Sequence, residues 1–90
     1  MEITKTSNSY SIKDSADGVE ITGNVVENVD GVISINLNAT YADDGADYYY
    51  TVSNGRVSVN YSAAESNKDN FVSRADTIVV EVLKHIANEN

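Results

Sequence analysis

The sequence has no cysteine, no proline and only one histidine among its 90 residues. Without cysteine, the chain can form neither a disulfide framework nor a thiolate metal site. Small domains that lack both depend on a regular hydrophobic core or on a partner subunit. The lone histidine, His85, has no neighbouring pattern that supplies a nucleophile or a substrate group within its reach. We therefore predict no catalytic residue, no cofactor and no enzymatic activity.

Long apolar runs and clusters of basic residues are missing as well. An apolar stretch such as Ile78–Val80 is far shorter than the roughly 20 residues that span a bilayer. The amino terminus is polar and lacks the apolar core of a signal peptide, so we expect a soluble, cytoplasmic protein. The formal net charge is −8, and the six Lys and Arg residues are scattered along the chain. We expect no membrane binding and no nucleic-acid binding, because binding to phosphates takes clustered basic residues.

Regular turn signals divide the first two thirds of the chain. Four glycines stand beside Asp or Asn at intervals of about 10–14 residues, which is typical of an antiparallel β protein; they are Gly18, Gly31, Gly45 and Gly55. Between them, apolar and polar residues alternate with period two, most clearly over residues 33–41. A chain of this length has room for one domain, and we assign residues 1–90 to it.

The dipeptide Asn54-Gly55 predicts a type I′ hairpin with a two-residue loop. This register places six apolar residues on one face, in the pairs Val52 with Val57, Tyr50 with Val59, and Tyr48 with Tyr61. A register shifted by one residue would send every side chain to the other face. The agreement between turn and pattern therefore fixes this hairpin, and all six residues are expected to point toward the core.

Two earlier connections are less regular. Around Asp30, a two-residue loop would pair apolar with polar residues, so we predict a three-residue loop at 29–31 that sets Val25 opposite Ile35 and Gly23 opposite Leu37. Gly23 would then leave space for a helix side chain. In the first strand, Tyr10 and Ile12 are expected opposite Ile21 and Val19, across a loop at 14–17. A bulge near Ser7–Ser9 would return Ile3 to the core.

From residue 62 onward the apolar period changes to 3.6, which indicates an amphipathic helix. Its expected apolar stripe is Phe71, Val72, Ala75, Ile78, Val79, Val82, Leu83 and Ile86. Capping-box patterns begin at Ser62 and at Ser66, so the helix should begin between residues 62 and 66. At about 1.5 Å per residue it would be about 35 Å long, enough to cross the whole sheet.

We therefore predict an α+β fold of two layers, an antiparallel five-stranded β-meander with one C-terminal amphipathic helix packed on one face. The expected strands lie near residues 2–13, 19–28, 32–42, 47–53 and 56–61, and the expected helix lies near residues 63–88.

Acidic residues concentrate in two predicted loops, at Asp14, Asp17, Asp43, Asp44 and Asp47. Clustered carboxylates favour calcium. However, the run from Asp43 to Asp47 lacks the alternating ligands and the distal glutamate of an EF-hand loop. The two loops would also lie about 10 Å apart, at two strand spacings. Turn formation explains these aspartates, and we predict no metal site.

Two surfaces are candidates for binding. The first is the outer sheet face, which is polar without charge and whose candidate binding residues are Tyr49, Asn36, Asn38 and Thr51. This face could receive a protein or a carbohydrate, although a solvated face of an antiparallel sheet has the same pattern. The second surface is the last strand, an expected edge whose only charge is Arg56. The first strand, by contrast, carries Lys5 and Lys13, which discourage edge pairing. Homodimerisation through the last strand or through the helix is therefore an alternative.

The leading functional hypothesis is a small non-catalytic protein-interaction module that uses either the polar sheet face around Tyr49 or the acidic pole expected where the two aspartate-rich loops gather. Its short, acidic and cysteine-free composition, rich in Asn, Asp, Ser and Tyr, is typical of an accessory protein of a bacterium or its phage. The alternative hypothesis is a structural subunit that assembles with itself as a homodimer or a higher oligomer. The expected partner is thus another protein or a second copy of the chain.

Overall fold

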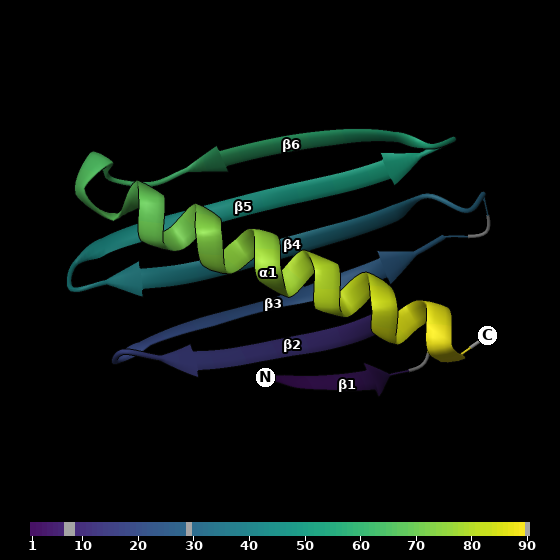
Figure 1. Ribbon diagram of the computed structural model, residues 1–90, viewed down its shortest axis with the longest axis horizontal. Helices are drawn as coiled ribbons and strands as arrows, with labels where there is room; N and C mark the ends of the chain where they lie inside the picture. The colour runs from purple at the N-terminus through teal and green to yellow at the C-terminus, as the bar shows by residue number, and fades with distance from the viewer. Residues whose placement is uncertain (7–8, 29, 90) are drawn as a thin grey trace.

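A computed structural model describes residues 1–6, 9–28 and 30–89 of the chain (Figure 1). The fold is α+β, with an antiparallel sheet of six strands in sequence order and one C-terminal helix packed on it. The elements are β1 (Glu2–Thr6), β2 (Ser9–Ala16), β3 (Val19–Glu27), β4 (Ile33–Tyr41), β5 (Asp44–Ser53), β6 (Arg56–Ser62) and α1 (Glu65–Glu89). α1 lacks the apolar length that crossing a membrane requires.

The sheet has six strands rather than five, because the chain reverses within the predicted first strand. β1 and β2 are antiparallel, with Ile3 opposite Ile12. This pairing places Ile3 against the core, where it is half-buried. The predicted bulge near Ser7–Ser9 falls partly on residues 7 and 8, which lie outside the described residues. The reversal returns Ile3 to the core, as the bulge was expected to do, and it also adds a ladder of main-chain hydrogen bonds between β1 and β2.

The predicted loop at 14–17 is wrong. Asp17 and Gly18 have φ values of 54° and 77°, and such left-handed values at both positions are those of a two-residue type I′ turn. β2 therefore continues to Ala16, and Tyr10 lies opposite Val25 instead of Ile21. The shift is four residues. Because four is an even number, Tyr10 still faces the core, where it is buried.

A second tight turn changes the start of β5. Ala42 has a φ of 54°, and Tyr41 pairs with Asp44, so β5 begins at Asp44 and not near residue 47. Asp44 and Asp47, both expected in a loop, are therefore strand residues. Asp14 is a strand residue too, in β2. These two turns are shorter than predicted, and β2 and β5 extend further toward them.

The other two connections confirm the predicted registers. Val25 pairs with Ile35, and Gly31 has a φ of 81°. The Gly31 N–H donates to the carbonyl of Asn28, as a short loop requires; Val29, inside the predicted loop, lies outside the described residues. At the other hairpin, Asn54 has a φ of 53°, and all three predicted pairs between β5 and β6 are present.

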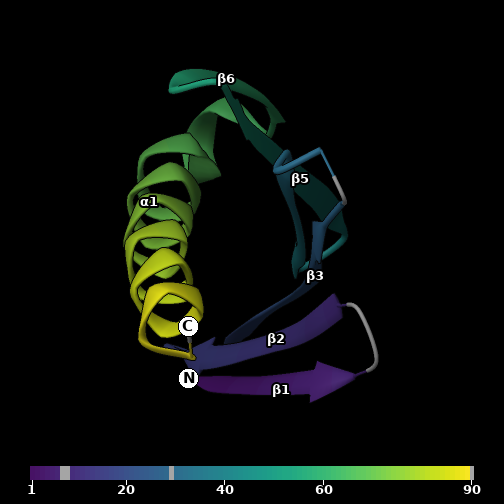
Figure 2. The ribbon, with the colours of Figure 1, turned by 90° about the vertical axis from the view of Figure 1, so that its right-hand side faces the viewer.

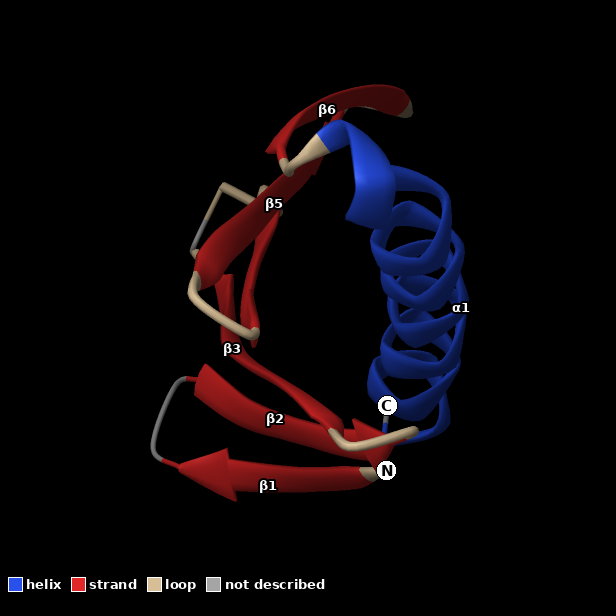
Figure 3. Ribbon diagram, turned by 90° about the vertical axis from the view of Figure 1, so that its left-hand side faces the viewer, coloured by secondary structure: helices blue, strands red, loops and turns tan. Residues whose placement is uncertain are grey.

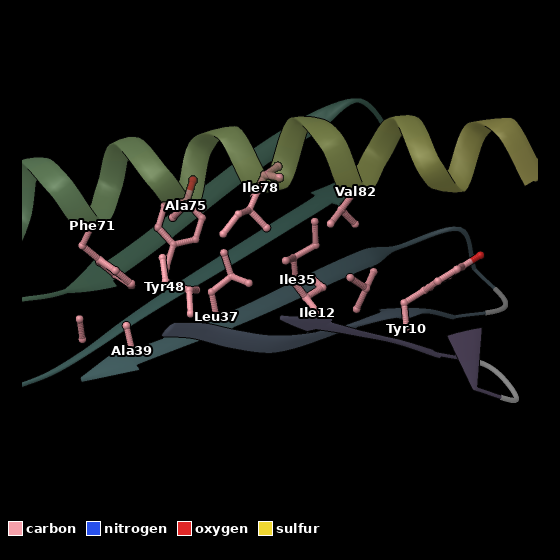
Figure 4. Close-up of a cluster of buried hydrophobic side chains, with 14 of the residues drawn as sticks. Tyr10, Ile12, Ile35, Leu37, Ala39, Tyr48, Phe71, Ala75, Ile78 and Val82 are labelled. Carbon is pink, nitrogen blue, oxygen red and sulfur yellow. The ribbon is translucent and has the colours of Figure 1, made fainter. Parts of the chain in front are cut away.

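The helix crosses the inner face of the sheet diagonally. It begins beside the end of β6 and ends over β2 and β1 (Figure 1), while the sheet curls around it (Figures 2 and 3). Glu65, the first helical residue, lies within the predicted range. The buried helix residues are Phe71, Ala75, Ile78, Val79, Val82 and Ile86. They pack against the inner side chains of β2 to β5 (Figure 4), and Val72 and Leu83 complete the predicted stripe as half-buried residues.

Tyrosine hydroxyls tether the helix to the sheet along its length. Tyr41 donates to Asn70 Oδ1 at 2.7 Å, Tyr48 donates to Asp76 Oδ1 at 2.7 Å, and Tyr10 donates to Glu89 Oε2 at 2.8 Å. Each ring packs at the core while its hydroxyl reaches a polar partner. Burial, together with the hydrogen bond to Asp76, raises the pKa of Tyr48. These three tethers come from β4, β5 and β2.

Arg74 joins the helix to β2 and to the turn between β2 and β3. Its guanidinium donates to the carbonyl of Val19 at 3.1 Å and to Asp14 Oδ2 at 3.3 Å. The Arg74 side chain is only 13% exposed, so this ion pair is better shielded from water than those on the open surface. Helix and sheet are thus joined near both ends of the helix.

Candidate protein-interaction surface

β6 is an edge strand, and all seven of its residues are exposed. Val57, Val59 and Tyr61 point to the inner face, as the sequence predicts, but they are 52%, 42% and 44% exposed. Their expected burial in the core is therefore wrong. The helix starts beside the end of β6 and runs diagonally away from this strand (Figure 1), in keeping with the exposure of Val57 near the start of the strand.

The open edge of β6 also presents unpaired main-chain groups. In a two-residue hairpin, the residues that flank the turn, here Ser53 and Arg56, form a hydrogen-bonded pair. Bonded and non-bonded pairs alternate from there, so Val57, Val59 and Tyr61 turn their N–H and C=O groups away from β5. The three residues with exposed apolar side chains are therefore the ones that offer hydrogen bonds to an added strand.

The two edges of the sheet differ in how well they are guarded. β1 has five residues, of which Glu2 and Lys5 are charged, and the Lys5 ammonium lies 3.4 Å from Glu89. β6 has seven residues in unbroken register with β5, and its one charge, Arg56, stands beside the turn. Short length, charges and bulges are the usual defences of an edge against pairing. β1 has two of these defences and β6 has almost none.

A hollow of about 620 Å³ separates Tyr61 from the first half of α1. Val72 contributes an apolar wall, and Asp76, the acceptor of the Tyr48 hydrogen bond, lies on the same wall. Lys68 and Asp69 add one charge of each sign. This hollow is lined mostly by polar side chains, and it lies between the exposed apolar surface of β6 and the helix.

The residues predicted to bind on the outer face do come together. Asn36 lies opposite Tyr49 on β4 and β5, Asn38 follows Asn36 on the same face, and Thr51 follows Tyr49. Tyr49 is 43% exposed, and its hydroxyl donates to Ser34 Oγ at 3.4 Å. The face is polar and well solvated, which is ordinary for an antiparallel sheet with one covered side. A binding role for these four residues stays a prediction.

His85 lies at the C-terminal end of the helix, among charged neighbours. Its Nε2 is 3.2 Å from Glu89 Oε1, and its ring meets Tyr10 edge to face at 5.9 Å. With Glu81 it lines an open hollow of about 500 Å³ that no hydroxyl or thiol side chain lines. Lys84 and Met1 line the same hollow, so it presents titratable groups of both signs.

The aspartates do not combine into a cation site in the part of the chain that the structure describes. Asp14 is bound to Arg74, and within residues 1–6, 9–28 and 30–89 no three side chains of His, Cys, Asp or Glu are close enough to hold a metal ion. No protein family, curated protein or solved structure matches the chain.

Proposed function

We propose that this protein is a non-catalytic interaction module that binds a protein partner by adding a strand to β6. The observation that carries the proposal is the coincidence, at Val57, Val59 and Tyr61, of exposed apolar side chains with outward main-chain groups. In strand addition, the main-chain hydrogen bonds supply affinity and alternate side chains supply specificity. β6 offers both along one unbroken strand.

The outer face around Tyr49 is a weaker candidate for the binding surface. Its Asn, Ser and Thr side chains are satisfied by water, so leaving them exposed costs little. An unguarded apolar edge is different, because it also promotes unwanted aggregation. An edge that is kept open despite this hazard is better explained by a partner that covers it.

The proposal can be tested by replacing Ser58 with a photo-crosslinking amino acid in cells that produce the protein. Ser58 lies in the middle of β6, and its main-chain groups face β5, so the replacement keeps the outward hydrogen-bonding groups. We expect a discrete adduct from position 58 and none from the same residue at Thr40, an exposed outer-face position on β4. The adduct mass distinguishes a second copy from a different protein.

Two valine substitutions supply the matched control. Val59→Lys places a charge on the inner side of the edge, which opposes strand pairing. Val80→Lys makes the same change at another exposed valine, on α1, which is 51% exposed against 42% for Val59. We expect Val59→Lys to abolish the adduct and Val80→Lys to preserve it. An adduct that survives Val59→Lys, or is lost only in Tyr49→Ala with Asn36→Ala, would refute strand addition at β6.

A further inference from the structure

We infer that the strand added to β6 is β6 of a second copy, paired antiparallel about a two-fold axis that passes through Val59. The inference rests on the proposed function and names the partner. Three features of β6 favour this partner: its main-chain pattern, the position of its single charge and the distribution of its apolar side chains.

The main-chain pattern selects one register. Two antiparallel strands bond through residues whose N–H and C=O groups face each other, and on β6 these are Val57, Val59 and Tyr61. Centred on Val59, Val57 pairs with Tyr61 of the second copy and Val59 pairs with its own equivalent, so all three residues are used. A shift of two residues loses one of these pairs. A shift of one residue sets main-chain groups that point toward the new strand opposite groups that point back toward β5. It also places the apolar side chains of the two copies on opposite faces of the sheet.

The single charge of β6 finds an opposite charge in this register. Arg56 points to the outer face and lies opposite Ser62 of the second copy, which in turn pairs with Asp47 across β5. The backbones that carry Arg56 and Asp47 are then two strand spacings apart, about 10 Å. A long arginine side chain can pass over the small serine to reach the carboxylate. Among the described residues, neither Arg56 nor Asp47 forms an ion pair within one chain.

The apolar side chains also match. The two-fold axis keeps both helices on one face of a sheet that continues from one copy to the next, and it brings Val57, Val59 and Tyr61 of both copies side by side on that face. Directly opposed apolar and aromatic side chains are the pairs that stabilise antiparallel strands. A foreign strand would need apolar residues at alternate positions and an acidic neighbour near Arg56. A second copy supplies all of these features without further assumption.

The net charge of −8 on each copy opposes association. Charges separated by more than the Debye length, about 8 Å at physiological ionic strength, are screened, whereas the Arg56 to Asp47 contact is shorter. We therefore expect a reversible dimer that forms as concentration rises.

Sedimentation equilibrium of the purified full chain over a wide concentration range tests the inference. The expected result is a monomer–dimer equilibrium that Val59→Lys abolishes and Val80→Lys leaves unchanged. Arg56→Asp and Asp47→Arg should each weaken the dimer by about tenfold, because each places like charges together. The double variant Arg56→Asp with Asp47→Arg restores the opposite charges and should return the affinity to within about threefold of the parent. Circular dichroism confirms that each variant is folded.

A strict monomer, a dimer insensitive to Val59→Lys, or a charge swap that fails to restore association overturns the inference. These results are distinguishable from failure of the proposed function. A monomeric protein whose position 58 crosslinks to a different protein retains strand addition and rejects the second copy. A protein that yields neither a dimer nor an adduct rejects both.

Discussion

The substitution Gly23→Ala is expected to destabilise the fold strongly, because β3 and β4 approach each other too closely there for a side chain. A Cβ atom at Gly23 would lie 1.9 Å from the carbonyl oxygen of Asn36 and 2.9 Å from Cδ2 of Leu37. Carbon and oxygen normally approach to about 3.3 Å, so β4 would have to move by more than about 1 Å. Leu37 can rotate, but the Asn36 oxygen belongs to a strand that is paired on both sides.

The magnitude follows from overpacking, which costs about 1–3 kcal/mol and is largest where backbone must move. A gain of about 0.4–1 kcal/mol from reduced freedom of the unfolded chain offsets part of it. We expect Gly23→Ala to lower the free energy of unfolding by about 2 kcal/mol. For a domain of this size, that lowers the Tm by about 8–16 °C. Urea and thermal unfolding followed by circular dichroism measure both quantities.

Gly45→Ala is the matched control. Gly45 also lies in a strand, β5, but its added Cβ would meet nothing within 4 Å, and its φ is not in the left-handed range. We expect Gly45→Ala to leave stability unchanged or to raise it by less than about 1 kcal/mol. If the two variants differ by less than about 0.5 kcal/mol, the close approach at Gly23 does not limit the fold, and the reasoning is refuted.

Two further predictions concern the tyrosine tethers. The raised pKa of Tyr48 means that the folded chain holds the phenol proton more tightly than the unfolded chain, so the free energy of unfolding should fall as the pH rises above about 10. In urea titrations, Tyr48→Phe should lower the free energy of unfolding by about 1 kcal/mol at neutral pH and should lessen the loss of stability at alkaline pH. An equally steep alkaline loss in the variant would contradict this prediction. The hydrogen bond from Tyr10, helped by Lys5, lowers the pKa of Glu89. The stabilisation that Glu89 contributes is therefore present above about pH 4.5 and is lost as the pH falls through the folded pKa. Glu89→Gln should lower the hydrogen-exchange protection of the last helical turn several-fold at pH 7, and the protection that remains should no longer depend on acid. Unchanged protection in the variant would reject the tether.

The sequence predicted well wherever turn chemistry and periodicity agreed. Asn54-Gly55 set the register of β5 and β6, and the change of period after residue 62 located the helix. Asp17-Gly18 carries the same kind of turn signal, but polar residues on its N-terminal side mask the end of β2, so the predicted loop begins too early in the sequence. Ile3 points inward at an odd-numbered position, whereas Tyr10 points inward at an even-numbered one, so the alternation of side chains must change between them. Either a bulge or a reversal explains such a change, and alternation alone does not distinguish them.

Gly23 shows a limit of a different kind. The sequence correctly placed it opposite Leu37 and predicted space for a helix side chain, but β4 itself occupies that space. The alternation of apolar and polar residues predicts which residues pair and which face each side chain occupies, whereas the distance between strands depends on how far the sheet curls. That curl is a property of the whole packed sheet and helix, and no single segment specifies it.

The exposure of β6 was missed for a similar reason, although the constraint that produces it is present in the sequence. Only residues 63 and 64 separate β6 from α1, so the helix must begin beside its own edge strand. To cover strands on the far side it must then cross the sheet diagonally, and the corner that carries Val57 stays open. The side-chain pattern correctly gave the direction of Val57 and Val59, but burial depended on the path of the helix.

The tethers and the open edge occupy different parts of the molecule. Tyr10, Tyr41 and Tyr48 hold the helix from β2, β4 and β5, and Arg74 holds it to the turn between β2 and β3. None of these contacts involves β6, so a strand can be added there without breaking a helix contact or moving a core residue. Strand addition to such a surface needs little rearrangement, and most of the interaction energy remains available for binding. The arrangement that leaves β6 exposed therefore also favours the proposed strand addition.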